Sequence, residues 1–427
     1  MQLEKQLINW RRDFHRFPEQ GFLEIRTASI VASILESLGF DLQLGKEVMK
    51  EDECMGKPDA AKTKAHVVWA KENGAVERFL PYFEEGFTGI VATIDTKRPG
   101  PTVTFRVDMD ALPIIESDSS QHTPATLGFR STAEGSMHAC GHDAHTSIGL
   151  GLATLVAEKQ DELNGVIKLI FQPAEEGTRG ARAMARAGVV DDTDFFIASH
   201  IGTGVPQQHF VAANNGFLAT TKLNITFTGK AAHAGGEPEA GKNALLAAAS
   251  AALNIHAICR HSGGDSRINV GELHAGSGRN VIANHATLIA ETRGETSEVN
   301  SYMKEQVENI VKGAAQMYGI DYSIETAGEA ISCKCSDDLA KKLANIAGQH
   351  EFIEHVEVTS EANAGSEDAT YFLEAVQKHG GQATYCIFGT DLAAGHHHEC
   401  FDINEDTLLP AVEILFAAAK ELSRTSE

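Results

Sequence analysis

The densest group of side chains that could do chemistry lies in residues 137–145, which read MHACGHDAH. Cys140 and His142 stand two residues apart, just before a helix expected over 142–159. Thiolates and imidazoles are common ligands of zinc and related ions, so these two side chains can converge on one metal. A helix start would also stabilise the Cys140 thiolate. Taken alone, the segment fits a metal site and a capped helix start with incidental histidines equally well.

Acidic residues and histidines recur at similar places along the chain, at or just past the ends of expected strands and before the last helix. They are Asp108 with Asp110, Glu175 with Glu176, His200, and the run GHHHE at 395–399. Ligands of open α/β sheets bind at the carboxyl ends of the strands. A single such residue is usually a turn or surface group, but four coincidences at equivalent positions favour one shared site.

The neighbouring carboxylates Glu175 and Glu176 have a specific use beside metal ions. One can bind a metal while the other takes a proton from a metal-bound water, whose pKa falls toward neutrality. The same carboxylate can then return the proton to a leaving amine. This is the apparatus of a metal-dependent amide hydrolase. A serine nucleophile is not indicated, because the sequence has no G-x-S-x-G segment.

The elements that must position these residues alternate between strand and helix. Such alternation predicts an α/β fold with a mixed, largely parallel sheet and helices on both faces. The expected strands are 89–96, 102–110, 165–173, 194–201 and 384–388, and the expected helices are 2–16, 26–38, 142–159, 177–188, 337–350 and 405–422.

A different order of elements begins near residue 217. Strand, helix, two strands, helix and strand follow one another, which is the order of a ferredoxin-like βαββαβ unit. We therefore expect a discontinuous catalytic domain over 1–216 and 330–427, with an inserted lid and dimerisation domain over 217–329. Residues 45–86 look like a further insertion, to which the sequence assigns no role.

Composition excludes several classes of function. The formal net charge is −23, so counterion release on nucleic acid would not favour binding, and anionic membrane surfaces are equally poor partners. No apolar run approaches the length of a membrane span, and the first residues do not resemble a signal peptide. Seven cysteines, an odd number, argue against a disulfide framework. We expect a cytoplasmic, reduced enzyme.

The chain resembles the two-metal aminoacylase and carboxypeptidase superfamily of amidohydrolases, in the HACGHD branch that includes hippurate and auxin-conjugate hydrolases. Segments along essentially the whole chain carry the resemblance: WRRDFHRFPEQGFLE, RVDMDALP, MHACGHDAHT, FQPAEEGTRGA, ASHIG, TGKAAHAGGEPEAGKNAL, GSGRNVI, ETRG, AGSEDA and GHHHECFDINED. Within the branch, the insertion with EGFTGIVATIDT and the segments GSEDAT and LAAGHH imply p-aminobenzoyl-glutamate as the substrate.

The resemblance implies a role for each matching residue. Two divalent ions, manganese or zinc, would be held with the Cys140 thiolate bridging them, and Glu175 would be the general base. The implied ligands are Cys140, His142, Glu176, His200 and His397, and the implied groups that orient them are Asp108, Asp110 and Glu367. Counting back from Phe401 selects His397, with His396 and His398 as alternatives, since this chain lacks the proline usual in that run.

In the inserted domain, the resemblance implies that His233 and Asn280 reach a partner's active site. His233 would polarise the scissile carbonyl, Asn280 would hold the substrate carboxylate, and Arg293 is a further candidate carboxylate contact. Each has an ordinary alternative: a turn residue for His233, a cap for Asn280 and a surface ion pair for Arg293. The implied dimer forms through the lid, either as a homodimer or as a heterodimer with a paralogous chain.

The predicted function is therefore cleavage of the amide bond of an N-acyl amino acid. The alternatives are a general N-acyl-amino-acid hydrolase with a different pocket, a subunit that needs a paralogous partner, and a hydrolase that uses Cys140 as a nucleophile without metal.

Overall fold

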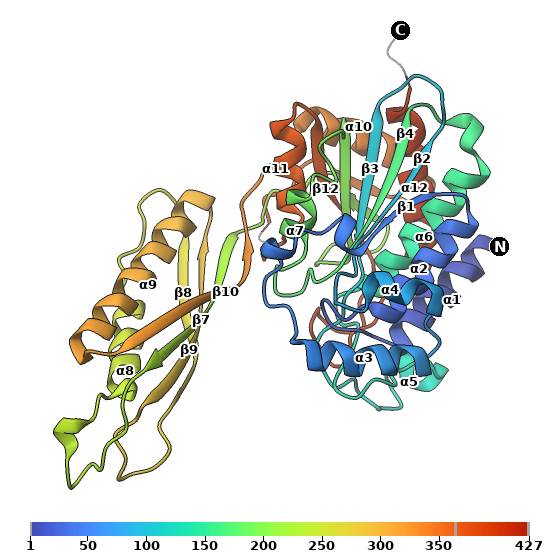
Figure 1. The fold of residues 1–427 in the computed structure, drawn as a ribbon. Coiled ribbons are helices and arrows are strands. Elements are labelled where there is room, and N and C mark those ends of the chain that lie inside the picture. Colours follow the sequence, from blue (N-terminus) through green and yellow to red (C-terminus); the bar gives the residue numbers. More distant parts are fainter. Residues whose placement is uncertain (1, 363–364, 425–427) are drawn as a thin grey trace. The chain divides into compact units, whose positions relative to one another are not determined.

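The computed structural model describes residues 2–362 and 365–424 (Figure 1). By its internal contacts the chain divides into two units. The larger unit comprises Met1–Gly216, Cys333–Ala364 and Asp368–Glu427, and the smaller unit comprises Phe217–Ser332 and Gly365–Glu367. No helix of the described residues is long and apolar enough to cross a membrane.

The larger unit is built on one eight-stranded sheet. Its order is β1 (Asp41–Leu44), β2 (Ile90–Asp95), β4 (Val166–Gln172), β3 (Thr102–Asp108), β5 (Phe195–Ile201), β12 (Gln382–Phe388), β6 (His209–Val211) and β11 (His355–Glu357). The four central strands β4, β3, β5 and β12 run parallel, whereas β2 pairs with β4 and β6 with β12 in the antiparallel sense. The predicted mixed, largely parallel sheet is confirmed.

The register of the central strands brings their carboxyl ends to one edge. Asp108 of β3 lies opposite Gln172 of β4, and Ile201 of β5 lies opposite Phe388 of β12. These strands are buried along almost their whole length, which is why β4, β5 and β12 contain runs of consecutive apolar residues. Residues that directly follow the strands therefore meet at this edge.

Helices cover both faces of this sheet (Figure 1). On one face α6 packs on β3, with α1 and α12 against it, while α7 and α11 lie on the other face, α11 against β12. The main helices are α1 (Gln2–Arg16), α2 (Ile25–Ser37), α3 (Ala60–Glu72), α6 (His142–Glu158), α7 (Ala181–Arg186), α10 (Asp337–Ala347), α11 (Thr370–Lys378) and α12 (Leu408–Leu422).

Two expected helices differ from the structure. The helix expected over 177–188 forms only at Ala181–Arg186, because residues 173–180 form a hydrogen-bonded turn instead. The helix expected over 405–422 begins with a 3₁₀ turn at Glu405–Thr407 before α12. Sequence reasoning also missed α11 and two short strands, β11 at the edge of the sheet and β6 next to it. Short strands and helices carry too few residues for a periodic pattern to stand out.

The smaller unit is a four-stranded antiparallel sheet in the order β10, β7, β9, β8. Helices α8 and α9 share one apolar core with the buried side chains of β7 and β9. This strand order and the chain order of the elements match the ferredoxin-like unit expected from the sequence. The elements are β7 (Ala219–Thr228), α8 (Ala244–His256), β8 (Ser266–Ala275), β9 (His285–Gly294), α9 (Ser297–Tyr318) and β10 (Asp321–Ala330).

Candidate metal centre

Side chains from the strand ends, from the start of α6 and from the loop before α12 meet around the Cys140 sulfur. Its sulfur belongs to two groups of possible ligand atoms, each with all atoms within 4.8 Å of one another. One group adds His200 and His396, and the other adds Glu176 and His397. The Cys140 sulfur therefore lies within reach of possible ligand atoms from three different parts of the chain.

Cys140 reaches this position because the chain turns sharply at Gly141. Gly141 has φ 97°, in the left-handed region, and a Cβ there would lie 2.7 Å from Cγ2 of Ile201 at the end of β5. Only glycine fits this turn without a shift of its neighbours. The turn leaves Cys140 before the helix and His142 as the first residue of α6.

Asp110 holds the two adjacent glutamates through their backbone. Its Oδ1 accepts a hydrogen bond from the Glu175 N–H and its Oδ2 accepts one from the Glu176 N–H, both at 2.9 Å. Oδ1 also lies 3.3 Å from Nδ1 of His142. Glu175, His142 and Glu176 form a further group of ligand atoms within 4.8 Å. Asp110 therefore orients both glutamates and the imidazole, as expected of a group behind a metal site.

Asp108 fixes a histidine that sequence reasoning named only as part of a motif. Its Oδ1 lies 2.6 Å from Nδ1 of His145, and the Nε2 of His145 accepts a hydrogen bond from the Ile201 N–H. This acceptor role places the ring proton on Nδ1, so His145 donates to Asp108. Burial opposes ionisation of Asp108, but His142 and Arg106 hold the pKa of the carboxyl well below its usual range.

The three consecutive histidines before α12 have different surroundings. Nδ1 of His396 lies 3.6 Å from the Cys140 sulfur, while its Nε2 accepts a hydrogen bond from the Thr203 N–H at 2.9 Å. In the neutral ring the proton then sits on Nδ1 and faces the sulfur, so this nitrogen is a donor rather than a ligand. His398 accepts a hydrogen bond from the Cys400 N–H within its own loop.

His397 has a φ of 63°, in the left-handed region. Its Nε2 lies 3.4 Å from Oε1 of Glu176. Contacts with the Cys140 sulfur and the Glu176 carboxylate raise the pKa of His397 to about 10 in the absence of a cation. Of the three histidines, His397 has the surroundings that best suit a ligand.

Two buried atoms that lack a hydrogen bond in the described part of the chain fit a divalent cation near Cys140. Nε2 of His142 and Oε1 of Glu176 are buried and lack a hydrogen-bond partner among the described residues. Burial and the Glu176 carboxylate raise the pKa of the Cys140 thiol. A cation would satisfy these two atoms and favour the Cys140 thiolate. Sulfur, imidazole and carboxylate together suit zinc or a related transition metal.

The residues predicted in the inserted domain separate into two places within the smaller unit. His233 and Asn280 are exposed neighbours, because His233 bridges Val281 and the Ala234 N–H donates to the Asn280 carbonyl. Arg293 lies near the far end of β9, about 25 Å along the strand from His285. There its Nε donates to Oε1 of Glu291 at 2.6 Å. The structure therefore does not bring Arg293 and Asn280 together.

Glu367 belongs to the smaller unit by its contacts and is buried. Its role as a group that orients a ligand stays a prediction.

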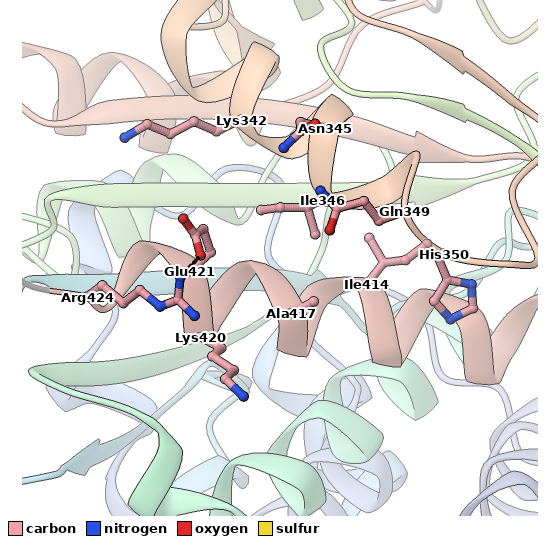
Figure 2. Close-up of a pocket in the computed structure, with 10 residues that line it drawn as sticks. All are labelled: Lys342, Asn345, Ile346, Gln349, His350, Ile414, Ala417, Lys420, Glu421 and Arg424. Atoms are coloured by element: carbon pink, nitrogen blue, oxygen red, sulfur yellow. Dashed lines mark hydrogen bonds and ion pairs between the residues drawn. The ribbon is translucent and has the colours of Figure 1, made fainter.

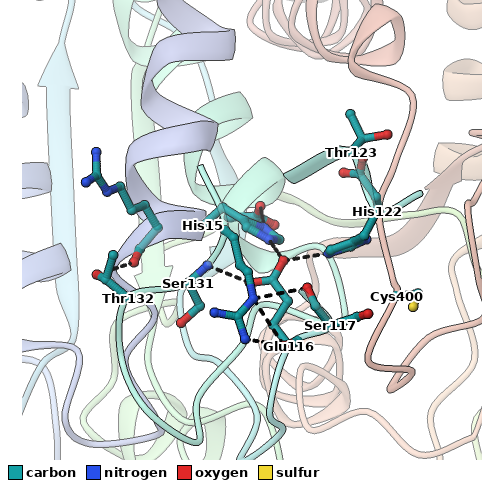
Figure 3. A network of polar contacts seen from close by, with 12 residues as sticks. His15, Glu116, Ser117, His122, Thr123, Ser131, Thr132 and Cys400 are labelled. Atoms are coloured by element: carbon teal, nitrogen blue, oxygen red, sulfur yellow. Dashed lines mark hydrogen bonds and ion pairs between the residues drawn. The ribbon is translucent and has the colours of Figure 1, made fainter. Parts of the chain in front are cut away.

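A second, wholly buried polar network lies behind the start of α6 (Figure 3). His15 of α1 contacts two carboxylates, with Nδ1 2.8 Å from Asp143 and Nε2 2.9 Å from Glu116. Arg11 also donates to Asp143, and His122 lies 2.7 Å from Glu116. Burial by itself would lower the pKa of His15, but the two carboxylates raise it to about 9. The network ties α1 to the residue that follows His142.

This network predicts a specific loss of stability at alkaline pH. The pKa of His15 is raised from an unfolded value near 6.5, so its contribution is complete below that pH and is lost as pH rises through about 9. We expect the free energy of unfolding to fall by up to about 3 kcal/mol over this range. Urea titrations of the wild type and His15→Gln at several pH values measure the difference, and parallel pH profiles would contradict it.

The structure also has a groove of about 370 Å³ between α10 and α12 (Figure 2). It contains none of the possible metal ligands around Cys140. Its lining is Lys342, Asn345, Ile346, Gln349, His350, Ile414, Ala417, Lys420, Glu421 and Arg424. Two of its cations are already paired, Lys420 with Glu162 and Arg424 with Glu421. The groove is therefore not part of the candidate metal centre.

Comparison with known proteins gives consistent similarities. The model of peptidase family M20/M25/M40 matches residues 104–421. The chain is 52% identical to the indole-3-acetyl-aspartic acid hydrolase of Enterobacter agglomerans over 422 residues, 98% of this chain and 96% of that protein. It is also 52% identical to a p-aminobenzoyl-glutamate hydrolase subunit of Escherichia coli (strain K12) over 421 residues, with the same two coverages. The crystal structure of an aminobenzoyl-glutamate utilization protein from Klebsiella pneumoniae superposes with a TM-score of 0.86 at 47% identity, covering 98% of this chain and 96% of that one.

Proposed function

Because this chain belongs to peptidase family M20/M25/M40 and is a metal-dependent amidohydrolase, we propose that its substrate is p-aminobenzoyl-glutamate, cleaved to p-aminobenzoate and glutamate. The observation that carries the proposal is that Glu176 belongs to two groups of possible ligand atoms, one with Cys140 and His397 and one with His142 and Glu175. Glu175 is 8% exposed, and its Oε2 lies 3.9 Å from Nε2 of His142. A carboxylate so placed can act on a water held at the cluster.

In this proposal two divalent ions, manganese or zinc, are held by Cys140, His142, Glu176, His200 and His397. When bound, the ions supply a water of near-neutral pKa and an electrophile for the carbonyl oxygen. Glu175 takes a proton from the water as the water oxygen attacks the amide carbon. The same carboxyl then gives the proton to the amide nitrogen, so that glutamate leaves as an amine. Asp110 keeps Glu175 in place through the backbone bond described above.

The choice of substrate is supported by what the relatives' names have in common. One relative is named for an indole-3-acetyl conjugate of aspartic acid and another for a p-aminobenzoyl conjugate of glutamate. Both join an aromatic acyl group to an acidic amino acid. Such a substrate is an anion, and a chain with a net charge of −23 must create local positive charge to bind it. The metal ions and the donors of Asn280 would supply it.

We further propose that the smaller unit forms a dimer and carries His233 and Asn280 to the partner's active site. The relative that is named as one subunit of a hydrolase supports the need for a partner, which is a second copy or a paralogous chain. The exposure of His233 and Asn280 on the smaller unit supports their availability for this role. His233 would hydrogen-bond the carbonyl oxygen as negative charge develops on it. The predicted location is the cytoplasm.

The substrate assignment predicts a clear preference in a panel of amides. The purified chain, with added manganese or zinc and without a paralogous chain, should hydrolyse p-aminobenzoyl-glutamate at least about tenfold faster, in kcat/KM, than hippurate or N-acetyl amino acids. Chelation should abolish the activity, and either metal should restore it.

Each rival function gives a different result in this panel. Equal rates on hippurate would indicate a general N-acyl-amino-acid hydrolase. Activity that appears only with a paralogous chain would indicate a dependent subunit. Activity that survives complete metal removal would contradict the mechanism and favour Cys140 as a nucleophile.

A further inference from the structure

The two functional glutamates follow directly on an unusual turn. Pro173 after β4 has no N–H, so Ala174 offers the first backbone donor beyond the strand. Ala174 has φ 52°, a left-handed conformation that is costly for a residue with a Cβ. Such a conformation persists only when surrounding contacts hold it. The N–H groups of Glu175 and Glu176 donate to Asp110, so the Ala174 N–H must be held by another group.

That group is Glu24, at the start of α2. Its Oε1 accepts a hydrogen bond from the Ala174 N–H at 2.8 Å, and its Oε2 contacts the Thr88 hydroxyl at 2.6 Å. Glu24 and Thr88 are both fully buried. Burial and the nearby Asp110 carboxylate raise the pKa of Glu24 to about 8. A neutral side chain of the same shape can therefore make both contacts.

We propose that Glu24, fixed by Thr88, is a positioning residue for Glu175 and Glu176. This role rests on the function proposed for those two glutamates. Without its carboxyl group the Ala174 N–H would be buried and unpaired. Rotation of Ala174 out of the left-handed region would relieve the backbone strain and also the cost of the unpaired N–H. Because Glu175 is the next residue, that rotation would move its carboxyl group away from His142.

The test compares two glutamate variants and one threonine variant with the wild type. Glu24→Ala should lower kcat by about 10- to 100-fold with little change in KM, and weaken the binding of Mn²⁺ to the metal-free protein by about tenfold. Glu24→Gln should restore both, because its amide oxygen can accept from Ala174 and its NH₂ can donate to the Thr88 hydroxyl. Thr88→Val keeps the shape of the side chain and should show the same losses in weaker form. It serves as the test in case Glu24→Ala does not fold.

Glu19→Ala is the matched control. Glu19 is an equally buried carboxylate, and its two oxygens accept hydrogen bonds from the Arg26 and Thr27 N–H groups of α2 rather than from the turn at residues 173–180. It should lower Tm while leaving kcat and Mn²⁺ affinity near the wild-type values.

The proposal is overturned if Glu24→Ala lowers Tm as Glu19→Ala does but keeps kcat and Mn²⁺ affinity. It is also overturned if Glu24→Gln behaves as Glu24→Ala. Failure of the proposed function is distinguishable, because the wild type would then leave p-aminobenzoyl-glutamate intact while the Mn²⁺ affinities of the four variants still decide the role of Glu24.

Discussion

Replacement of Glu175 by glutamine is expected to lower kcat by about a thousand-fold or more while the bound metal is retained. Glutamine has the same shape and still offers an oxygen, but it cannot take the proton from water. The backbone bond from residue 175 to Asp110 does not depend on the side chain, so the turn should keep its conformation. Steady-state rates together with metal analysis of the purified variant measure both parts of the expectation.

The neighbouring glutamate is the natural control. Glu176→Gln makes the same chemical change one residue further along, and Glu176 shares a ligand group with Cys140 and His397. It should lower the metal content as well as the rate. Near-normal turnover by Glu175→Gln would show that the base is another residue, and loss of metal from Glu175→Gln would show that Glu175 is itself a ligand.

Loss of His233 is expected to lower kcat by about 10²- to 10³-fold, as removal of one donor to a developing oxyanion does. Because His233 is proposed to serve the partner's site, this loss should be reversible by mixing. Exchange of protomers between His233→Ala and Glu175→Gln proteins should recover about one quarter of the wild-type rate, since half the dimers are mixed and each has one intact site.

The mixing experiment has a clear negative outcome. If His233 acted in its own protomer, every site in the mixed dimer would lack either His233 or Glu175, and the rate would stay at the level of the separate variants. A control mixture of wild type with Glu175→Gln should give half the wild-type rate whichever protomer supplies His233. Native mass spectrometry would verify that exchange has taken place.

The sequence predicts well which residues meet at the carboxyl ends of the central strands, because the end of a strand can be recognised from the residues around it. Asp108, Glu175 and His200 each end or follow a buried apolar run, and parallel pairing then brings them together without further information. The same reasoning could not place Arg293. It stands near the end of β9 with Glu291 as its partner, and only the register of the smaller sheet shows how far it lies from Asn280.

Two residues that act through distant backbone groups are not indicated by the sequence. Glu24 lies 150 positions before Ala174, and nothing in its own segment indicates that it holds the N–H of that residue. His145 is similar, since its orienting role appears only from its contacts with Asp108 and the Ile201 N–H. Spacing along the chain reports which side chains share an element, but not which distant backbone groups they meet.

The position of β12 in the sheet affects the order in which the two units can fold during translation. β12 lies between β5 and β6, yet it is translated after the whole of Phe217–Ser332. On the ribosome the smaller unit can therefore complete its own core while the larger sheet still lacks a central strand. Ribosome-bound chains should carry a folded smaller unit before Cys140, Glu176 and His397 can meet. Metal would then be acquired only at the end of synthesis.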